Sequence, residues 1–260
     1  MKSKSIFLFS IILFLTVVSN YSAQDFKEVD KTFKMDKTGT VTLDTYKGDV
    51  TIETWDKAEV HVYAKITPDE QFWGTKKRTQ LENAEVVFDD SHNSVSIKSK
   101  YNHEDSWFGS NTMAFVNYKI QMPKTAELKV EDYKSEIKIY GVQSSIRLKT
   151  YKGDIRIKEL TGSINLETYK GQAEISFTQL KSDSRLETTK GDITVSLPGK
   201  TAFTVSADLG RRAGFTSDFN INREENKKKH AGSNFKREIN GGGPVLNISS
   251  EKGEIKLRSN

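Results

Sequence analysis

Residues 128–197 decide the fold, because one short phrase recurs along them with small changes. Read in order, the copies are LKVEDYKSEIKI from Leu128, IRLKTYKGDIRI from Ile146, INLETYKGQAEI from Ile164 and SRLETTKGDITV from Ser184. The lysines of these phrases lie 18, 18 and 20 residues apart. A fixed step near 20 residues is typical of proteins built from stacked repeats.

Two further copies lie outside this stretch. VTLDTYKGDVTI occupies residues 41–52, far upstream, and NISSEKGEIKL closes the chain at 247–257. Within a copy, apolar residues alternate on both sides of the Tyr-Lys-Gly turn, as Ile146 and Leu148 do before it and Ile155 and Ile157 after it. This alternation indicates two short strands per unit, each with one inward face.

The repeat predicts an all-β fold and leaves two architectures open. In a β-solenoid each unit is one rung, and equivalent residues stack at the spacing of paired strands. In a meander, Lys-Gly would be the two-residue loop of an antiparallel hairpin. The nearly unchanged phrase favours like stacking on like, so we expect a short single-chain solenoid with about 18–20 residues per rung. A hexapeptide helix is excluded, because an aliphatic residue does not recur every six positions.

The rest of the chain predicts the following organisation. Residues 24–123 read as an N-terminal antiparallel β segment, with a short helix expected within 68–83. Residues 124–200 form the repeat region. Residues 201–260 hold a C-terminal β segment and the closing copy, which would cover the open end of the stack.

Residues 1–23 have the pattern of an export signal. Lys2 and Lys4 precede the apolar run 6–18, and Ser22 and Ala23 offer a cleavage point before Gln24. The run is 13 residues long, short of the roughly 20 that span a bilayer. We therefore expect an exported protein without a transmembrane span after cleavage. Loss of the two lysines lowers the formal net charge from +5 to +3, which argues against nucleic acid as a partner.

The chain has no cysteine. Disulfides, a lipid-modified cysteine, thiolate metal sites and a cysteine nucleophile are therefore all excluded. The four histidines (His61, His92, His103 and His230) lack the spacing of a zinc or catalytic site. We expect no metal, no cofactor and no catalytic residues.

Stacking would place the turn residues of successive copies in an outward row, which is the candidate site for a ligand. Tyrosine rings could stack on a glycan or peptide while the lysines supply charge, although aromatic residues also stack along such a row simply to stabilise it. The candidate contact residues are Tyr133, Tyr151, Tyr169, Lys134, Lys152 and Lys170.

Carboxylates would align as well, and they raise a different possibility. A β-helix enzyme acting on polysaccharide places paired acids in a groove. Here lysines such as Lys129, Lys138 and Lys149 flank the acids, so ion pairs on a solvated surface are the better explanation. The aligned acids are Glu131, Glu167 and Glu187 before the turn and Glu136, Asp154 and Asp192 after it.

Two polar loops are further candidates. Residues 227–230 (KKKH) could contact anionic lipid or polysaccharide, but Glu224, Glu225 and Glu238 lie close by. Residues 101–112 carry Trp107 and Phe108, whose exposure would suggest recognition or a cap over the fold.

Four features occur together in this sequence: the leader at residues 1–23, the stretch GTVTLDTYKGDVTIETWDKAEVHVYA, the tandem phrase and the closing GEIKL. Together they resemble the bacterial "putative adhesin" family of β-strand-repeat proteins, an exported domain of unknown function. The resemblance implies an elongated β-repeat fold and an adhesive role, and it supplies no catalytic residues. We therefore expect a non-enzymatic surface or periplasmic interaction module, with an envelope or extracellular glycan or protein as partner. The alternatives are a carbohydrate-active enzyme and an envelope spacer without a ligand.

Overall fold

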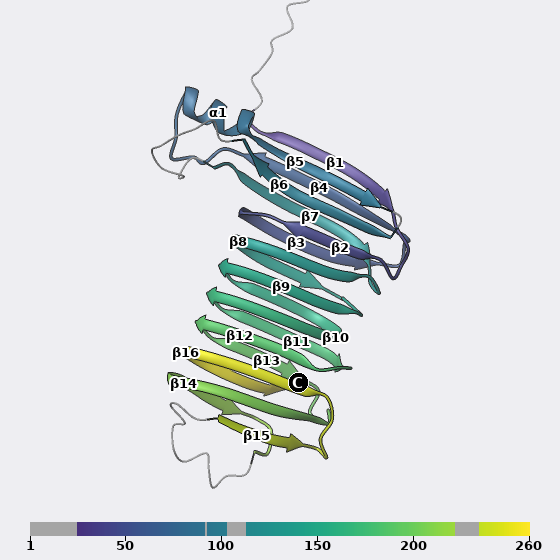
Figure 1. Cartoon of the computed structure of the whole chain (residues 1–260), viewed down its shortest axis with the longest axis vertical. Coiled ribbons are helices and arrows are strands. Elements are labelled where there is room, and N and C mark those ends of the chain that lie inside the picture. The colour runs from purple at the N-terminus through teal and green to yellow at the C-terminus, as the bar shows by residue number, and fades with distance from the viewer. Residues whose placement is uncertain (1–24, 92, 103–112, 222–233) are drawn as a thin grey trace, which may run out of the picture.

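The computed structural model describes residues 25–91, 93–102, 113–221 and 234–260. The described part is almost entirely β-strand, and the strands lie side by side in one elongated stack (Figure 1). The leader predicted at 1–23 lies outside the described residues. In chain order the elements are β1 (Lys27–Lys34), β2 (Thr40–Asp44), β3 (Lys47–Trp55), β4 (Glu59–Thr67), α1 (Thr75–Asn83), β5 (Ala84–Ser91), β6 (Ser94–Tyr101), β7 (Phe115–Pro123), β8 (Glu127–Tyr140), β9 (Ser145–Lys152), β10 (Ile155–Lys170), β11 (Ala173–Leu180), β12 (Ser184–Lys190), β13 (Ile193–Leu197), β14 (Phe203–Ser217), β15 (Asn234–Ile239) and β16 (Val245–Ser259).

Each copy of the phrase forms one rung, with two strands joined by a corner at the tyrosine and lysine. β9 pairs in parallel with the first part of β8 and the last part of β10. The first part of β10 pairs in parallel with the last part of β8. Every pairing matches residues one repeat apart, as Ile164 with Ile146 and Ile155 with Ile137. This register confirms the solenoid and excludes a meander, whose neighbouring strands would be antiparallel.

All six copies are neighbours in space. The upstream copy, β2 and β3, stacks in parallel on β8, with Val41 beside Leu128 and Val50 beside Ile137. The closing copy, β16, stacks in parallel on β12 and β13, with Ile255 beside Ile193. The order along the stack is therefore 41–52, 128–139, 146–157, 164–175, 184–195 and 246–257.

The N-terminal end of the stack is closed by strands inserted between the first and second copies. β4 pairs antiparallel with β1 and β7, and β5 pairs antiparallel with β6. The expected antiparallel pairing therefore holds for these strands, whereas β2 and β3 run parallel to β6, β7 and β8 because they belong to a rung. The predicted helical insertion is α1. The division of the chain at residues 123 and 200 stays a prediction.

The C-terminal end is closed in a similar way. β14 runs parallel to β16 along most of its length and pairs antiparallel with β15. Aromatic rings pack edge to face there, between Phe203 and Phe219 and between Phe215 and Phe235. The loop 227–230 predicted as a contact lies outside the described residues, as do most of the loop 101–112 and three of the histidines, His92, His103 and His230.

The core consists of inward columns that run the length of the stack. Equivalent residues of successive rungs, such as Leu43, Val130, Leu148 and Leu166, are all at most 1% exposed. Because equivalent residues lie one above another about 4.8 Å apart, each aliphatic side chain packs on its own counterparts. A residue type that fits one rung therefore fits the next, which explains why the phrase changes so little.

Candidate functional site

Four tyrosines from successive rungs stack face to face along the corner, and we call them the tyrosine ladder (Tyr46, Tyr133, Tyr151 and Tyr169). Their ring centroids are 4.5, 5.0 and 4.8 Å apart, and neighbouring planes differ by 9°, 6° and 2°. Tyr133, Tyr151 and Tyr169 keep 41%, 45% and 36% of their surface exposed. The predicted alignment of these three residues is present, and Tyr46 of the upstream copy extends it.

The ring faces of the ladder are covered at both ends. Tyr101 packs edge-on against Tyr46 at 6.1 Å. Lys190 Nζ lies 5.1 Å over the ring of Tyr169 and donates a hydrogen bond of 3.1 Å to its hydroxyl. That hydroxyl raises the pKa of Lys190. The ladder therefore offers ring edges and phenol hydroxyls to a ligand, while its ring faces contact one another.

Lysines occupy the next position in all six rungs, and we call them the lysine row (Lys47, Lys134, Lys152, Lys170, Lys190 and Lys252). They are matched residue for residue across the parallel pairings. Like charges on directly neighbouring strands repel one another. Keeping lysine at every rung therefore costs stability through this repulsion. The neighbouring tyrosine position is not kept in the same way, because it changes to Thr189 and Glu251 in the last two rungs.

Most of the lysine row has no counterion among the described residues. Lys47 is the exception, with its Nζ 2.7 Å from Asp69 and 3.8 Å from the centre of the Phe115 ring. Among the described residues no ion pair or side-chain hydrogen bond reaches Lys134, Lys152, Lys170 or Lys252. These four ammonium groups are exposed and free to meet a partner.

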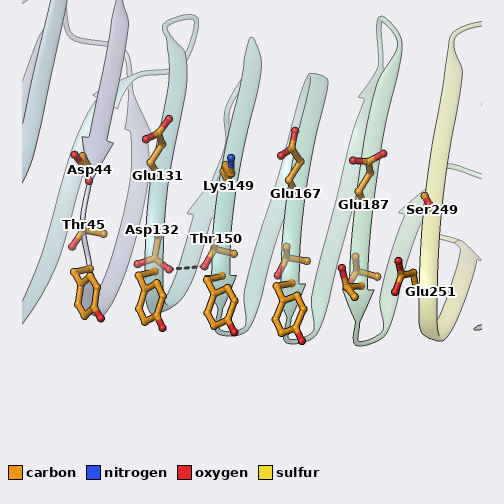
Figure 2. Close-up of a pocket in the computed structure, with 17 residues that line it drawn as sticks. Asp44, Thr45, Glu131, Asp132, Lys149, Thr150, Glu167, Glu187, Ser249 and Glu251 are labelled. Atoms are coloured by element: carbon orange, nitrogen blue, oxygen red, sulfur yellow. Dashed lines mark hydrogen bonds between the residues drawn. The ribbon is translucent and has the colours of Figure 1, made fainter. Parts of the chain in front are cut away.

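A groove of about 690 Å³ runs along the other side of the tyrosine ladder (Figure 2). Its far wall is what we call the acidic row (Asp44, Glu131, Glu167 and Glu187), interrupted by Lys149 and ending at Ser249. Its floor is a column of small polar residues. The lysines lie on the opposite side of the ladder, where Lys47, Lys134 and Lys152 line a second depression of about 450 Å³.

Asp132 breaks the column of hydroxyl residues under the groove. Thr45, Thr150, Thr168 and Thr188 hold the same position in other rungs and are buried. The Asp132 carboxylate accepts hydrogen bonds from Ser135 N at 3.0 Å, Ser135 Oγ at 2.5 Å and Thr150 Oγ1 at 2.6 Å. Burial raises the pKa of Asp132, although these hydrogen bonds oppose the change.

The acids after the turn are occupied by structural contacts. Asp154 Oδ1 accepts a hydrogen bond from Gln172 N, and Asp192 Oδ1 accepts one from Glu254 N, each at 2.9 Å. Glu136 pairs with Lys138 at 2.9 Å, which lowers the pKa of Glu136. The bonds of Asp154 and Asp192 tie neighbouring rungs together, whereas the Glu136 pair lies within one strand.

The acids before the turn are only partly paired. Glu187 pairs with Arg185 of its own strand, and Asp44 pairs with Lys98 at 2.6 Å. Glu131 and Glu167 form no ion pair with a described residue.

Other chemistry is sparse among the described residues. His61 Nε2 lies 2.8 Å from Asp30 Oδ1 at the surface. The described ranges contain no cluster of histidine, aspartate and glutamate suited to a metal ion. They also contain no helix long and apolar enough to span a membrane.

The sequence prediction did not include Tyr46, Lys47 and Lys252 in this row of tyrosines and lysines. The signal was present, because TYKG in the upstream copy and EKG in the closing copy are variants of the same phrase. What was lacking was the knowledge that both copies stack directly on the tandem ones. The groove beside the ladder was not predicted.

The family model described as Toastrack DUF4097 matches residues 33–258. None of the curated proteins searched matches the chain. The chain is similar to the solved structure of a "putative cell adhesion protein" from Clostridium sporogenes, at 15% identity and a TM-score of 0.48, with 90% of this chain and 100% of that chain covered.

Two further solved structures are similar at lower scores. A "putative adhesin" from Bacteroides fragilis has 13% identity and a TM-score of 0.44, with 89% of this chain and 97% of that chain covered. A "putative lipid binding protein" from Parabacteroides distasonis has 11% identity and a TM-score of 0.28, with 88% and 96% covered. The family match extends from the end of β1 into β16, and it confirms the resemblance carried by the repeated phrase. The chain belongs to the Toastrack DUF4097 family.

Proposed function

We propose that this protein is an exported, non-enzymatic, adhesin-like interaction module that meets its partner along the corner of the stack. The observation that carries the proposal is the lysine row. Lys134, Lys152 and Lys170 stand exposed and in register without a counterion from the described residues, beside the hydroxyls of Tyr133, Tyr151 and Tyr169. An arrangement that repels itself in the free protein is relieved when a partner supplies the opposite charge.

The state of the carboxylates supports a role without catalysis. A glycosidase needs one carboxyl group held protonated and a second one free to act on the same bond. The acids after the turn bind backbone N–H groups or neighbouring lysines. Asp132, the acid whose pKa burial raises, lies in the groove floor, where its carboxylate is held by hydrogen bonds from Ser135 and Thr150.

A binding screen tests the proposal. The chain from residue 24 onward, which retains every described element, is applied to an array of glycans and envelope components. We expect binding that is lost when Lys134, Lys152 and Lys170 are all changed to Ala. A matched control changes Lys158, Lys181 and Lys200, which are exposed elsewhere, and keeps the binding. Absence of any binding above background would instead favour an envelope spacer without a ligand.

Export and the absence of catalysis have their own measurements. Cell fractionation and N-terminal sequencing of the secreted chain should give a start at Gln24. Incubation with polysaccharides should release no product. Turnover that disappears in Glu167→Gln would establish the carbohydrate-active enzyme in place of the binding module.

A further inference from the structure

Two rows of opposite charge run parallel to each other on the two sides of the tyrosine ladder. The acidic row forms one wall of the groove, and the lysine row lies beyond the rings. Both rows have members that form no ion pair with any described residue, namely Glu131 and Glu167 on one side and Lys134, Lys152 and Lys170 on the other. We propose that the partner of this corner is a second copy of the same chain, held by the lysine row of each copy against the acidic row of the other. This inference rests on the proposed function as an interaction module.

Symmetry selects one arrangement. If the two corners face each other across a two-fold axis parallel to the stacking direction, the lysine row of each copy meets the acidic row of its partner. A two-fold axis across the stack would set lysine against lysine and acid against acid. The parallel arrangement is self-complementary, because the same patch serves on both copies, as a two-fold interface requires.

The spacing of the charges favours a copy of this chain over an extended peptide. Both rows repeat at the distance between paired strands, about 4.8 Å, so one in-register rung aligns all the others. Side chains on one face of an extended peptide repeat at about 6.7 Å and lose register within a few residues. In the aligned pair, Lys134 faces the partner's Glu131 and Lys170 faces the partner's Glu167, while Lys149 faces the partner's Lys152.

The shape of the surface suits the same contact. The groove between the acidic row and the tyrosine ladder is open to solvent along several rungs (Figure 2). A lysine stem lies well along apolar ring edges with its ammonium group at a carboxylate. Tyr133, Tyr151 and Tyr169 would meet their counterparts at the centre of the interface, where their exposed ring edges would lose contact with water. Such a narrow contact is weak for one pair of molecules, and it becomes effective when many copies are displayed on facing surfaces.

A bead-clustering experiment with exchanged charges tests this contact. Beads carry the chain from residue 24 onward in one of four forms: wild type, a lysine variant (K134E, K170E), an acid variant (E131K, E167K) and a control (K158E, K181E). Wild-type and control beads should cluster, less so as salt rises. Each charge variant alone should lose clustering, because like rows now face each other. A mixture of lysine-variant and acid-variant beads should cluster again.

The outcomes separate this inference from the proposed function. Wild-type beads that stay dispersed, a lysine variant that clusters like wild type, or a mixture that fails to recover would each overturn the homotypic contact. Clustering that appears only after heparin is added would assign the lysine row to an acidic polymer instead. Binding on the glycan array without clustering keeps the interaction module and rejects the self-contact. Unfolding temperatures of all forms are compared first, so that a folding defect is not scored as lost contact.

Discussion

At the scale of single residues, the corner of each rung depends on a glycine that no other residue replaces without cost. Gly171 has φ +142°, in the region that residues with a side chain disfavour. A Cβ there would meet the carbonyl oxygen of Gly153 in the preceding rung, 146–157. Ser135 holds this position in the rung 128–139 without a left-handed φ. In that rung the corner is held by two hydrogen bonds that Ser135 donates to the Asp132 carboxylate.

Gly171→Ala should therefore lower the free energy of unfolding by at least about 2 kcal/mol, from backbone strain and the clash together. Gly241→Ala is the matched control, because Gly241 also has a positive φ, +93°, but has no atom within 4 Å of an added Cβ. It should cost about 1 kcal/mol, from strain alone. Urea unfolding of both variants measures the difference, and equal losses would contradict the close contact between rungs.

Restoring the common phrase in the rung 128–139 should stabilise the protein. Asp132→Thr with Ser135→Gly removes a partly buried carboxylate and recreates TYKG, with an expected gain of about 1 kcal/mol at pH 7. Because the pKa of Asp132 is raised in the folded state, folded protein keeps this proton to a higher pH than unfolded chain does. The contribution of Asp132 to the free energy of unfolding therefore falls as the pH rises past the ordinary aspartate pKa.

The gain of the double variant should accordingly shrink as the pH is lowered toward the ordinary aspartate pKa, because the folded protein takes up the proton of Asp132 at a higher pH than the unfolded chain does. Parallel urea titrations of wild type and variant at several pH values measure this difference. The single change Ser135→Gly is the control, because it leaves the carboxylate in place. A gain that does not vary with pH would mean that the Asp132 carboxylate is not responsible.

At the scale of elements, the corner joins the strands of one rung and also carries the ladders that connect successive rungs. Tyr151 is covered on both faces, by Tyr133 and Tyr169. Part of the tyrosine ladder is therefore explained by stacking alone, as one of the two interpretations of the sequence expects. Lys134, Lys152, Lys170 and Lys252 have no such explanation, because no described residue forms an ion pair or side-chain hydrogen bond with them.

Tyr151→Ala should destabilise the fold by about 1–3 kcal/mol, because it removes two stacked ring contacts. Tyr151→Phe keeps both rings in contact and should stay within about 0.5 kcal/mol of wild type. Thermal and urea unfolding give the comparison. If the alanine variant were as stable as wild type, the rings would have to be kept for a partner and not for the fold.

At the scale of the whole molecule, a stack of strands must end, and its ends are where other chains could add. β1 forms one end, and most of its side chains are exposed and many are charged. Phe33 of β1 packs on Phe88 of β5 with ring centroids 5.1 Å apart, which closes the end over the core. Charged residues on an edge strand oppose pairing with a second sheet.

Removing the positive charges of β1 should therefore cause aggregation without loss of the fold. The variant Lys27→Thr, Lys31→Thr, Lys34→Thr is expected to scatter light at concentrations where wild type stays clear, with a similar unfolding temperature. The variant Lys158→Thr, Lys181→Thr, Lys200→Thr loses the same charge away from the edge. It should remain clear, and aggregation of both variants alike would point to net charge and not to the edge strand.

The sequence alone determined the periodic part of this protein. A step near 18 residues, the alternation within each copy and the constant Tyr-Lys-Gly corner were enough to predict a stacked all-β fold, its inward columns and the outward row of Tyr133, Tyr151 and Tyr169 with their lysines. These features are local or repeat exactly one unit along the chain, so a pattern in the letters reports them directly.

Only the tertiary structure decided where the two distant copies go. The segment between residues 52 and 128 folds back as the closing strands of one end, and this return lets 41–52 dock on 128–139. Pairing over that separation depends on backbone hydrogen bonds and burial, which leave no periodic mark in the sequence. This docking adds Asp44 to the acidic row and Lys47 to the lysine row, and the parallel pairing of β16 with β12 adds Lys252 at the other end. The upstream and closing copies thereby join the tandem copies in one continuous charged corner.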